Sequence, residues 1–205
     1  MATTFWDKRS EHYDKEIKQH DSLYDETIRR TKSLLVNTDV VLDFACASGE
    51  MSLDLAANVQ KINGIDLSVN MIALANQKVL DRKVKNSNFE KTDIFDQCLE
   101  SHDYSAVIAF NIIHLLDNPS KVLNRFNDLL PTGGLLITQT PCLGEKNIII
   151  QSLINVAQKL GVAPEIINLK YYELESLFSD SNFEIMESEI LEEKWKVRWI
   201  VARKM

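Results

Sequence analysis

Two aspartates stand at the ends of two short apolar runs, at a spacing that suits ligand binding. Asp43 lies near the end of the run 40–44, and Asp66 closes the run 61–66. A turn of very small residues, 45–49, follows the first run, and a helical pattern begins after it. A strand, a tight loop and a helix together hold a nucleotide-like ligand at the helix N-terminus. Asp66 follows the loop by about twenty residues, the offset at which such a fold binds ribose hydroxyls.

The elements that must position these acids follow from the hydrophobic pattern. The run 40–44 predicts a strand buried on both faces, as in a parallel sheet. The pattern predicts that strands and helices alternate along the chain, with helices at 49–59, 69–83 and 119–130 and strands at 61–66, 88–92, 104–110 and 135–140. The tail, 183–189 and 195–203, predicts an antiparallel pair at the sheet edge. Ligands in such open α/β sheets bind at the carboxyl ends of the strands, so Phe110, Asn111 and Ile112 should face the site.

Two segments fall outside the strict alternation. Residues 1–35 are polar with spaced apolar residues, and predict one or two amphipathic helices that must pack on the main body. Residues 141–180 predict helices at 147–160 and 171–179. We expect this second segment to form a wall of a substrate pocket.

Composition excludes several classes of protein. The chain has 205 residues and a net charge of −7, with no dense basic run, which argues against binding to a nucleic-acid backbone. The basic stretches 29–32 and 78–85 are expected to be solvated helix surface. No apolar run is long enough to span a bilayer, and the N-terminus lacks a secretion signal. The three cysteines, Cys46, Cys98 and Cys142, suit a reducing cytoplasm, and no Cys/His spacing predicts a metal site.

The stretch 40–50 resembles motif I of the class I S-adenosylmethionine-dependent methyltransferases, and 64–68 resembles their motif II. The likeness continues in order through 91–94, 107–114 and 130–137. It implies a single domain over residues 1–205, with a Rossmann-like, doubly wound α/β fold and a helical leader. The seven-stranded sheet would be mostly parallel, with an antiparallel C-terminal strand between two others.

The resemblance also implies a cofactor, S-adenosylmethionine, and the residues that hold it. Asp43 would approach the ammonium end, Asp66 the ribose, and Asp93 with Ile94 the adenine. The full set of matching positions is Asp43, Ala45, Ser48, Gly49, Asp66, Leu67, Met71, Asp93, Ile94, Phe110 and Asn111. Core packing explains Met71 equally well, and Asp93 could instead cap its own backbone.

One departure from the family concerns the cofactor loop. The family usually has Gly where this chain has Ala45 and Ala47, and only Gly49 remains. Gly permits positive φ and a close backbone approach, whereas Ala resists both. This departure bears on cofactor affinity more than on the fold.

His114 and Tyr13 are our candidates for orienting the methyl acceptor or handling its proton. A histidine can take a proton near neutral pH, although His114 also fits a satisfied polar residue at a helix start. Tyr13 matches a leader position that lies near the cofactor in the small-molecule branch of the family. Packing of the leader helix is the alternative for Tyr13 and for Trp6.

The predicted function is methyl transfer to a small molecule, with no nucleic-acid or membrane partner, and a homodimer is left open. A catalytically inactive methyltransferase-like binding or regulatory protein is the first alternative. A nicotinamide-dependent dehydrogenase is the second, but it requires a G-x-G-x-x-G loop and the chain has only Gly49 there. A nucleic-acid or protein methyltransferase is the third, and it lacks its Asn-Pro-Pro-Tyr type of motif after the fourth strand, where Phe110-Asn111-Ile112-Ile113 stands.

Overall fold

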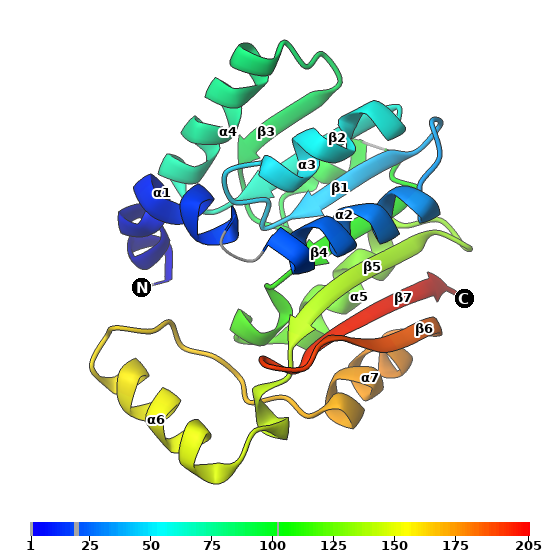
Figure 1. Cartoon of the computed structure of the whole chain (residues 1–205). Helices are drawn as coiled ribbons and strands as arrows, with labels where there is room; N and C mark the ends of the chain where they lie inside the picture. Colours follow the sequence, from blue (N-terminus) through cyan, green and yellow to red (C-terminus); the bar gives the residue numbers. More distant parts are fainter. Residues whose placement is uncertain (1, 19–20, 102) are drawn as a thin grey trace.

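One seven-stranded sheet carries the strands of the part of the chain that the structure describes (Figure 1). The structure is a computed structural model that describes residues 2–18, 21–101 and 103–205. The strands are β1 (Val40–Phe44), β2 (Lys61–Asp66), β3 (Ser87–Lys91), β4 (Ala106–Phe110), β5 (Leu135–Pro141), β6 (Phe183–Glu192) and β7 (Val197–Lys204).

The strand order is β3-β2-β1-β4-β5-β7-β6. Strands β3, β2, β1, β4 and β5 pair in parallel, whereas β7 is antiparallel to both of its neighbours, β5 and β6. The predicted α/β class, the mostly parallel sheet and the insertion of the last strand between two others are therefore confirmed.

The helices cover both faces of the sheet and add the predicted leader. They are α1 (Ala2–Lys18), α2 (Asp21–Leu34), α3 (Glu50–Leu55), α4 (Val69–Arg82), α5 (Pro119–Leu129), α6 (Ile148–Lys159) and α7 (Tyr171–Asp180). The helix predicted at 49–59 is shorter, because α3 passes into a 3-10 turn at Ala56–Asn58. Local capping sets other starts: the Ser68 side chain accepts a hydrogen bond from the Met71 N–H, and the Asn118 side chain accepts one from the Lys121 N–H.

The central strands bury residues on both of their faces, as the continuous apolar runs predicted. Leu42 of β1 and Val107 of β4 belong to a core shared with α5 and α7, and Val41 and Ile108 belong to a core shared with α2 and α3. Alternate residues of one strand point to opposite faces, so the sheet is doubly wound.

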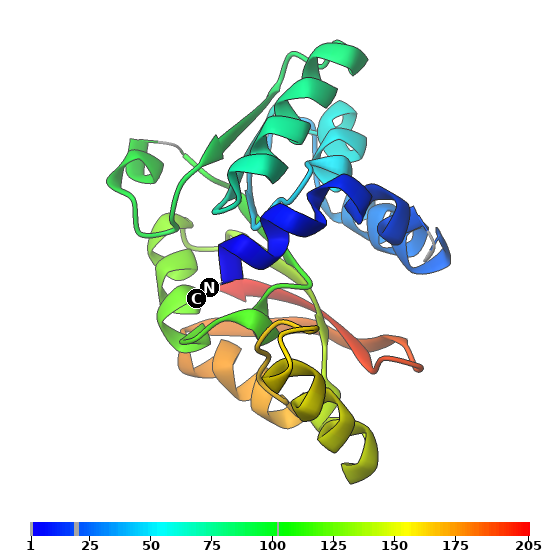
Figure 2. The same ribbon diagram turned by 90° about the vertical axis from the view of Figure 1, so that its left-hand side faces the viewer.

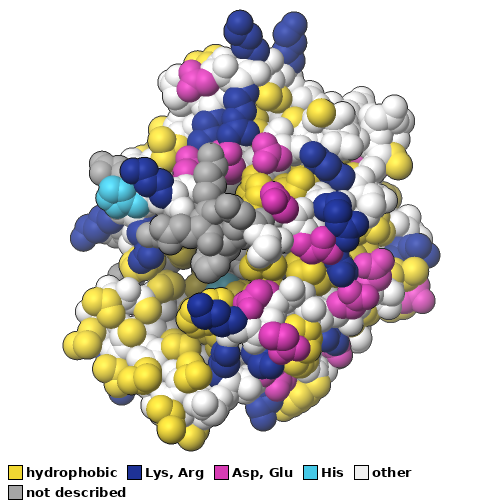
Figure 3. All heavy atoms as spheres, viewed as in Figure 1, with side chains coloured by type: hydrophobic (Ala, Val, Ile, Leu, Met, Phe, Trp, Pro, Cys, Tyr) yellow, Lys and Arg dark blue, Asp and Glu magenta, His cyan; other side chains and the backbone are white. Residues whose placement is uncertain are grey.

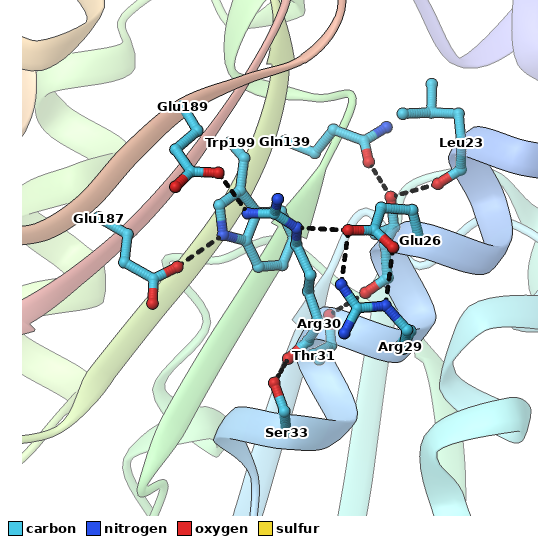
Figure 4. A network of polar contacts seen from close by, with 11 residues as sticks. Leu23, Glu26, Arg29, Arg30, Thr31, Ser33, Gln139, Glu187, Glu189 and Trp199 are labelled. Atoms are coloured by element: carbon cyan, nitrogen blue, oxygen red, sulfur yellow. Dashed lines mark hydrogen bonds and ion pairs between the residues drawn. The ribbon is translucent and has the colours of Figure 1, made fainter.

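A polar network fixes α2 to the far strands of the sheet (Figure 4). Arg30 contacts both Glu26, on its own helix, and Glu189 of β6 at 2.7 Å. The Thr27 hydroxyl bonds the Gln139 side chain at the end of β5. The Thr27 contact places the middle of α2 beside the carboxyl end of β5, where ligands bind in this class of sheet.

Helix α6 stands apart from these layers. Figures 1 and 2 both show it projecting from the body, beyond the end of β5 and the start of β7. None of its residues is fully buried. Among the described residues, no helix is long and apolar enough to cross a membrane.

Candidate active site

The small-residue loop after β1 lies between the two predicted acids. Its backbone is fixed to β2 by a hydrogen bond from the Cys46 N–H to the Ile65 carbonyl (3.0 Å). Ala45 and Ala47 both adopt the left-handed region, with φ of 58° and 48°. This is the conformation that glycine adopts without strain, and alanine pays about 1–2 kcal/mol to reach it. The loop thus keeps a glycine-type shape at two alanine positions.

Asp43 and Asp66 lie near the carboxyl ends of adjacent parallel strands. The Asp66 carboxylate accepts hydrogen bonds from the backbone N–H groups of Ala47 (3.0 Å) and Ser68 (2.8 Å). The Asp43 carboxylate accepts one from the Ser52 hydroxyl (2.5 Å). The structure therefore brings the two acids to one end of the sheet, with the loop between them.

Burial dominates the electrostatics of both acids. Burial raises the pKa of Asp43 to about 7; the Ser52 hydrogen bond opposes this rise, and the neighbouring charge of Asp66 contributes to it. Burial also raises the pKa of Asp66, against the backbone hydrogen bonds that favour its charged form. Two neighbouring buried acids held this way form a site that favours a positively charged group.

Two cavities open at this end of the sheet. The first has a volume of about 470 Å³ and the second about 490 Å³. They share a wall of seven residues, namely Trp6, Tyr13, Ala45, Ala47, Phe110, Asn111 and Leu115. Asp66 lines the first cavity and Asp43 the second. Ala45 and Ala47 line both cavities, and both cavities remain open beside them.

The first cavity contains most of the predicted cofactor residues. Its lining includes Leu67, Met71, Asp93, Ile94, Phe110 and Asn111. Asp93 uses one carboxylate oxygen to accept a hydrogen bond from the Phe95 N–H (2.9 Å), which is the self-capping alternative. Its position on the cavity wall is compatible with a ligand contact as well.

Ser48 and Gly49 lie differently from the other loop positions. The Ser48 hydroxyl donates a hydrogen bond to Asp14 of α1 and accepts one from the Lys78 ammonium of α4 (3.0 Å), so its side chain links the loop to both helices. Gly49 lines neither cavity among the described residues. A Cβ on Gly49 would lie 2.8 Å from Cζ of Phe89, and its φ is 71°. Packing against Phe89 and the left-handed backbone conformation therefore explain the glycine at position 49.

Helix α1 closes over the loop. Tyr13 and Trp6 meet edge to face with 6.2 Å between ring centroids, and both line the two cavities. Asp7 anchors the start of α1 through hydrogen bonds with Ser68 and Asn70 at the start of α4. Burial raises the pKa of Tyr13, and the charges of Asp66 and Asp43 raise it further, so this phenol keeps its proton at neutral pH.

Lys78 corrects the expectation that the basic stretch 78–85 is only solvated surface. Its side chain is largely buried, and its ammonium pairs with Asp14 of α1 (2.6 Å) and with Glu50 at the start of α3 (2.7 Å). Lys83 and Lys85 do lie exposed. Lys78 thus links the leader helix to the cofactor loop and to α4.

His114 lies on the wall of the second cavity, in the 3-10 turn Ile113–Leu115. Its Nδ1 has no hydrogen-bond partner among the described residues. Burial lowers the pKa of His114 to about 4, so the imidazole is neutral at physiological pH. A neutral ring can accept a hydrogen bond from a ligand, but burial disfavours the protonated, charged form of the imidazole.

Sequence reasoning missed other residues of the second cavity. Gln139, almost fully buried at the end of β5, donates to the Asn111 side chain (3.2 Å). A polar side chain in an otherwise apolar strand was the signal that could have found it. Trp195 also lines the cavity, from the turn between β6 and β7, and Pro164 lines it from the segment 141–180, where we expected a pocket wall. No local pattern marks such a meeting of loops.

Comparison with known proteins agrees with this geometry. The model of a family described as a methyltransferase domain matches residues 35–197. Among curated relatives, the ubiquinone biosynthesis O-methyltransferase of Candida albicans is 29% identical over 119 residues, which cover 57% of this chain and 36% of that protein. The demethylmenaquinone methyltransferase of Lactococcus lactis is 27% identical over 128 residues, which cover 60% and 50%. The chain thus spans half or less of the length of these relatives.

Solved structures share the fold at low identity. A Haloferax volcanii complex with a methyltransferase activator aligns with a TM-score of 0.77 and 12% identity, over 97% of this chain and 96% of that chain. Magnesium protoporphyrin IX methyltransferase from Synechocystis, with bound S-adenosylhomocysteine, aligns with a TM-score of 0.67 and 18% identity, over 89% and 84%. The family match spans most of the chain, so this protein belongs to the methyltransferase-domain family of class I S-adenosylmethionine-dependent methyltransferases.

Proposed function

We propose that this protein transfers a methyl group from S-adenosylmethionine to a small, largely apolar molecule that carries a hydroxyl or amine. The observation that carries the proposal is the pair of neighbouring cavities with a shared wall, one lined by Asp66 and the other by Asp43. The first cavity fits the adenosyl part of the cofactor, and the second fits an acceptor. S-adenosylmethionine supplies, when bound, a methyl group on a positively charged sulfur that is already a good leaving group.

The carboxylates of Asp66 and Asp43 define the proposed cofactor-binding site. Asp66 accepts two hydroxyl hydrogen bonds of the ribose, because a carboxylate offers several lone pairs at once. Asp43 faces the second cavity and binds the ammonium end, whose charge offsets the burial that raises the pKa of this acid. Met71 and Ile94 enclose the adenine with apolar surface, and Asp93 accepts from its amino group.

The acceptor seat is mostly apolar. Its wall includes Leu23, Met51, Pro141, Val162 and Val197. His114 lies on this wall with an Nδ1 that has no hydrogen-bond partner among the described residues, so it can bind a ligand, and Gln139 lies on the same wall. An apolar wall with a few polar groups selects a small molecule that has an apolar body and one reactive polar atom.

His114 orients the acceptor in this proposal. Its neutral ring accepts a hydrogen bond from the acceptor hydroxyl or amine, and takes the proton only as methyl transfer makes that group acidic. Tyr13, which keeps its proton, donates a hydrogen bond. Helix α1 and its ion pair from Asp14 to Lys78 keep water out of the reacting centre.

A methyl-transfer assay tests the proposal. The protein is incubated with methyl-labelled S-adenosylmethionine and a panel of apolar phenols, quinols and amines, and labelled product is measured in the organic phase. We expect transfer to a member of the panel, and a loss of about 100-fold in kcat/KM for His114→Asn with unchanged affinity for S-adenosylhomocysteine. His12→Asn, at an exposed site on α1, is the matched control.

The alternative of a binding or regulatory protein has one observation in its favour, the strained alanines of the loop. It would be supported by a protein that binds S-adenosylhomocysteine but transfers no label to any acceptor. Activity of His114→Asn equal to that of the wild type would reject the role of His114.

A further inference from the structure

Gln139 is a buried polar side chain that holds two other elements together. It lies near the carboxyl end of β5 and is almost fully buried. A buried amide is costly unless both of its ends are hydrogen-bonded. Both ends are bonded here, because Oε1 contacts the Thr27 hydroxyl of α2 and Nε2 donates to Oδ1 of Asn111 (3.2 Å). Gln139 therefore connects the leader helix α2 to the loop that follows β4.

Helix α2 is polar where it meets Gln139. Figure 3 shows acidic and basic side chains gathered over α2 and the neighbouring α3. A helix that covers a sheet normally buries apolar residues, but α2 buries Thr27 completely. The Leu23 carbonyl lies 2.7 Å from the Thr27 hydroxyl and already accepts the main-chain N–H of Thr27 in the helix, so the hydroxyl proton is available to Gln139. Figure 4 shows the Gln139 carbonyl oxygen pointing toward α2.

Asn111 is held by Gln139 through both its main chain and its side chain. The Asn111 N–H donates to the Gln139 carbonyl (2.7 Å), and the Asn111 side chain accepts from Gln139 Nε2. Asn111 has a φ of 56°, in the left-handed region, which Asn adopts more readily than most residues that carry a side chain. A backbone held in this region by its surroundings is common at functional sites. Gln139 thus determines how Asn111 leaves β4.

The other end of the Asn111 amide is directed to the cavities. Its Oδ1 is occupied by Gln139, whereas its Nδ2 makes no hydrogen bond with any residue that the structure describes. The side chain is exposed and belongs to the wall that the two cavities share. In the proposed function, the cofactor occupies the first cavity and the acceptor the second. An amide donor on the shared wall therefore lies where the methyl group passes from one ligand to the other.

We infer that Asn111 donates a hydrogen bond from Nδ2 to the reactive oxygen of the methyl acceptor, and that Gln139 is the residue that positions this donor. The inference rests on the proposed function and deepens it by naming the acceptor atom. A hydroxyl oxygen has two lone pairs, so one accepts from Asn111 while the other attacks the methyl carbon. The carbon–sulfur bond breaks as the carbon–oxygen bond forms, and the hydroxyl proton passes to His114.

The same donor selects against an amine. A neutral amine nitrogen has a single lone pair, and attack on the methyl carbon requires it. A hydrogen bond from Asn111 would occupy that lone pair, and the N–H groups of the amine would face a donor that cannot accept them. Mismatched donors of this kind are a common source of specificity. The acceptor class is therefore an apolar molecule with a hydroxyl group, which the protein methylates on oxygen.

Calorimetric titration of the full chain, saturated with S-adenosylhomocysteine, tests the inference. The probes are two pairs of matched shape, phenol with aniline and naphthol with naphthylamine, all uncharged near neutral pH. The wild type should bind the hydroxyl member of a pair about tenfold more tightly, which is the value of one hydrogen bond. Gln139→Met keeps the length of the side chain without its polar ends and should erase this preference. Asn111→Asp tolerates the left-handed backbone and presents only oxygens, so it should favour the amine member.

The matched control is Thr140→Val, on the same strand. Thr140 is fully buried outside both cavities, and its hydroxyl has no hydrogen-bond partner in the described part of the chain. This variant should keep the preference of the wild type. Circular dichroism and urea unfolding verify that all variants fold. In the methyl-transfer assay, Gln139→Met should lower kcat/KM for a hydroxyl acceptor about tenfold with unchanged affinity for S-adenosylhomocysteine.

Three results would overturn the inference. The first is a wild type that binds both members of each pair equally, or binds none of the probes. The second is a Gln139→Met variant that keeps the preference, which would reduce Gln139 to an anchor for α2. The third is an Asn111→Asp variant that loses affinity for S-adenosylhomocysteine but keeps the preference, which would assign Asn111 to the cofactor. Methyl transfer is judged separately by labelled product, so its failure would leave the measured preference for hydroxyl probes standing.

Discussion

Replacing Ala45 and Ala47 by Gly should stabilise this protein. Both residues have positive φ, 58° and 48°, where a Cβ costs about 1–2 kcal/mol. Glycine loses more conformational freedom on folding, which offsets about 0.4–1 kcal/mol of that gain. The expected net stabilisation is about 0.5–1 kcal/mol for each single variant. Both side chains line the two cavities, so their removal leaves no void in the packed core.

The assay is urea unfolding, with the midpoint and the slope measured separately. An upward shift of the midpoint with an unchanged slope reports native-state stability. For the double variant, about 1–2 kcal/mol corresponds to a rise in Tm of roughly 2–8 °C in a chain of this size. The two positions are close enough to couple, so both single variants are needed.

Ala56→Gly is the matched control. Ala56 has the right-handed φ of −54°, so glycine there should destabilise the protein by about 0.5–1 kcal/mol. If Ala45→Gly and Ala47→Gly lower stability as Ala56→Gly does, the left-handed loop and the strain assigned to it are wrong. The double variant should also bind S-adenosylhomocysteine at least as tightly as the wild type, because the backbone can approach the ligand more closely.

Three further predictions concern the elements around the loop. Affinity for S-adenosylhomocysteine should fall as the pH drops below about 7, because Asp43, whose pKa is raised, then gains a proton and loses its charge. The Asp43→Asn variant should bind weakly at every pH. A wild-type affinity that does not change with pH would contradict this. Lys78→Met should lose about 1.5 kcal/mol of unfolding free energy, because buried Glu50 loses one of its two cationic partners and keeps Arg82, and it should speed hydrogen exchange in α1; the exposed Lys83→Met should do neither. Gly64→Ala should destabilise the protein by about 1–3 kcal/mol in urea unfolding, because the added Cβ would lie 2.4 Å from Cδ1 of Phe89. An unchanged unfolding free energy would show that Phe89 has room to move.

The strands of the sheet could be predicted from the sequence because most of them are short apolar runs, which can be recognised without knowing the neighbouring strand. The run 40–44 implied a strand buried on both faces, and the structure has β1 between β2 and β4. The place of β7 between β5 and β6 came from the family resemblance, because pairing between distant strands leaves no local trace.

The rest depends on contacts between residues far apart in the sequence. Asp14 and Lys78 are 64 positions apart, so nothing local distinguishes Lys78 from the exposed Lys83. Burial sets the lowered pKa of His114, and burial at one residue is a property of the whole fold. The helix at 147–160 was predicted nearly within its observed bounds, but its periodicity could not tell that the apolar side would stay uncovered. Periodicity gives an apolar face, and only the tertiary fold shows what covers it.

The central claim is that Asp66 and Asp43 bind opposite ends of one cofactor. Calorimetric titration with S-adenosylhomocysteine tests it most directly, using the wild type, Asp66→Asn and, as an exposed acid outside both cavities, Asp81→Asn. Asp66→Asn should lose roughly 10- to 100-fold in affinity, since hydrogen bonds to a charged group contribute about 1.5–3 kcal/mol each, while Asp81→Asn should bind like the wild type. Equal affinity in all three proteins would contradict it.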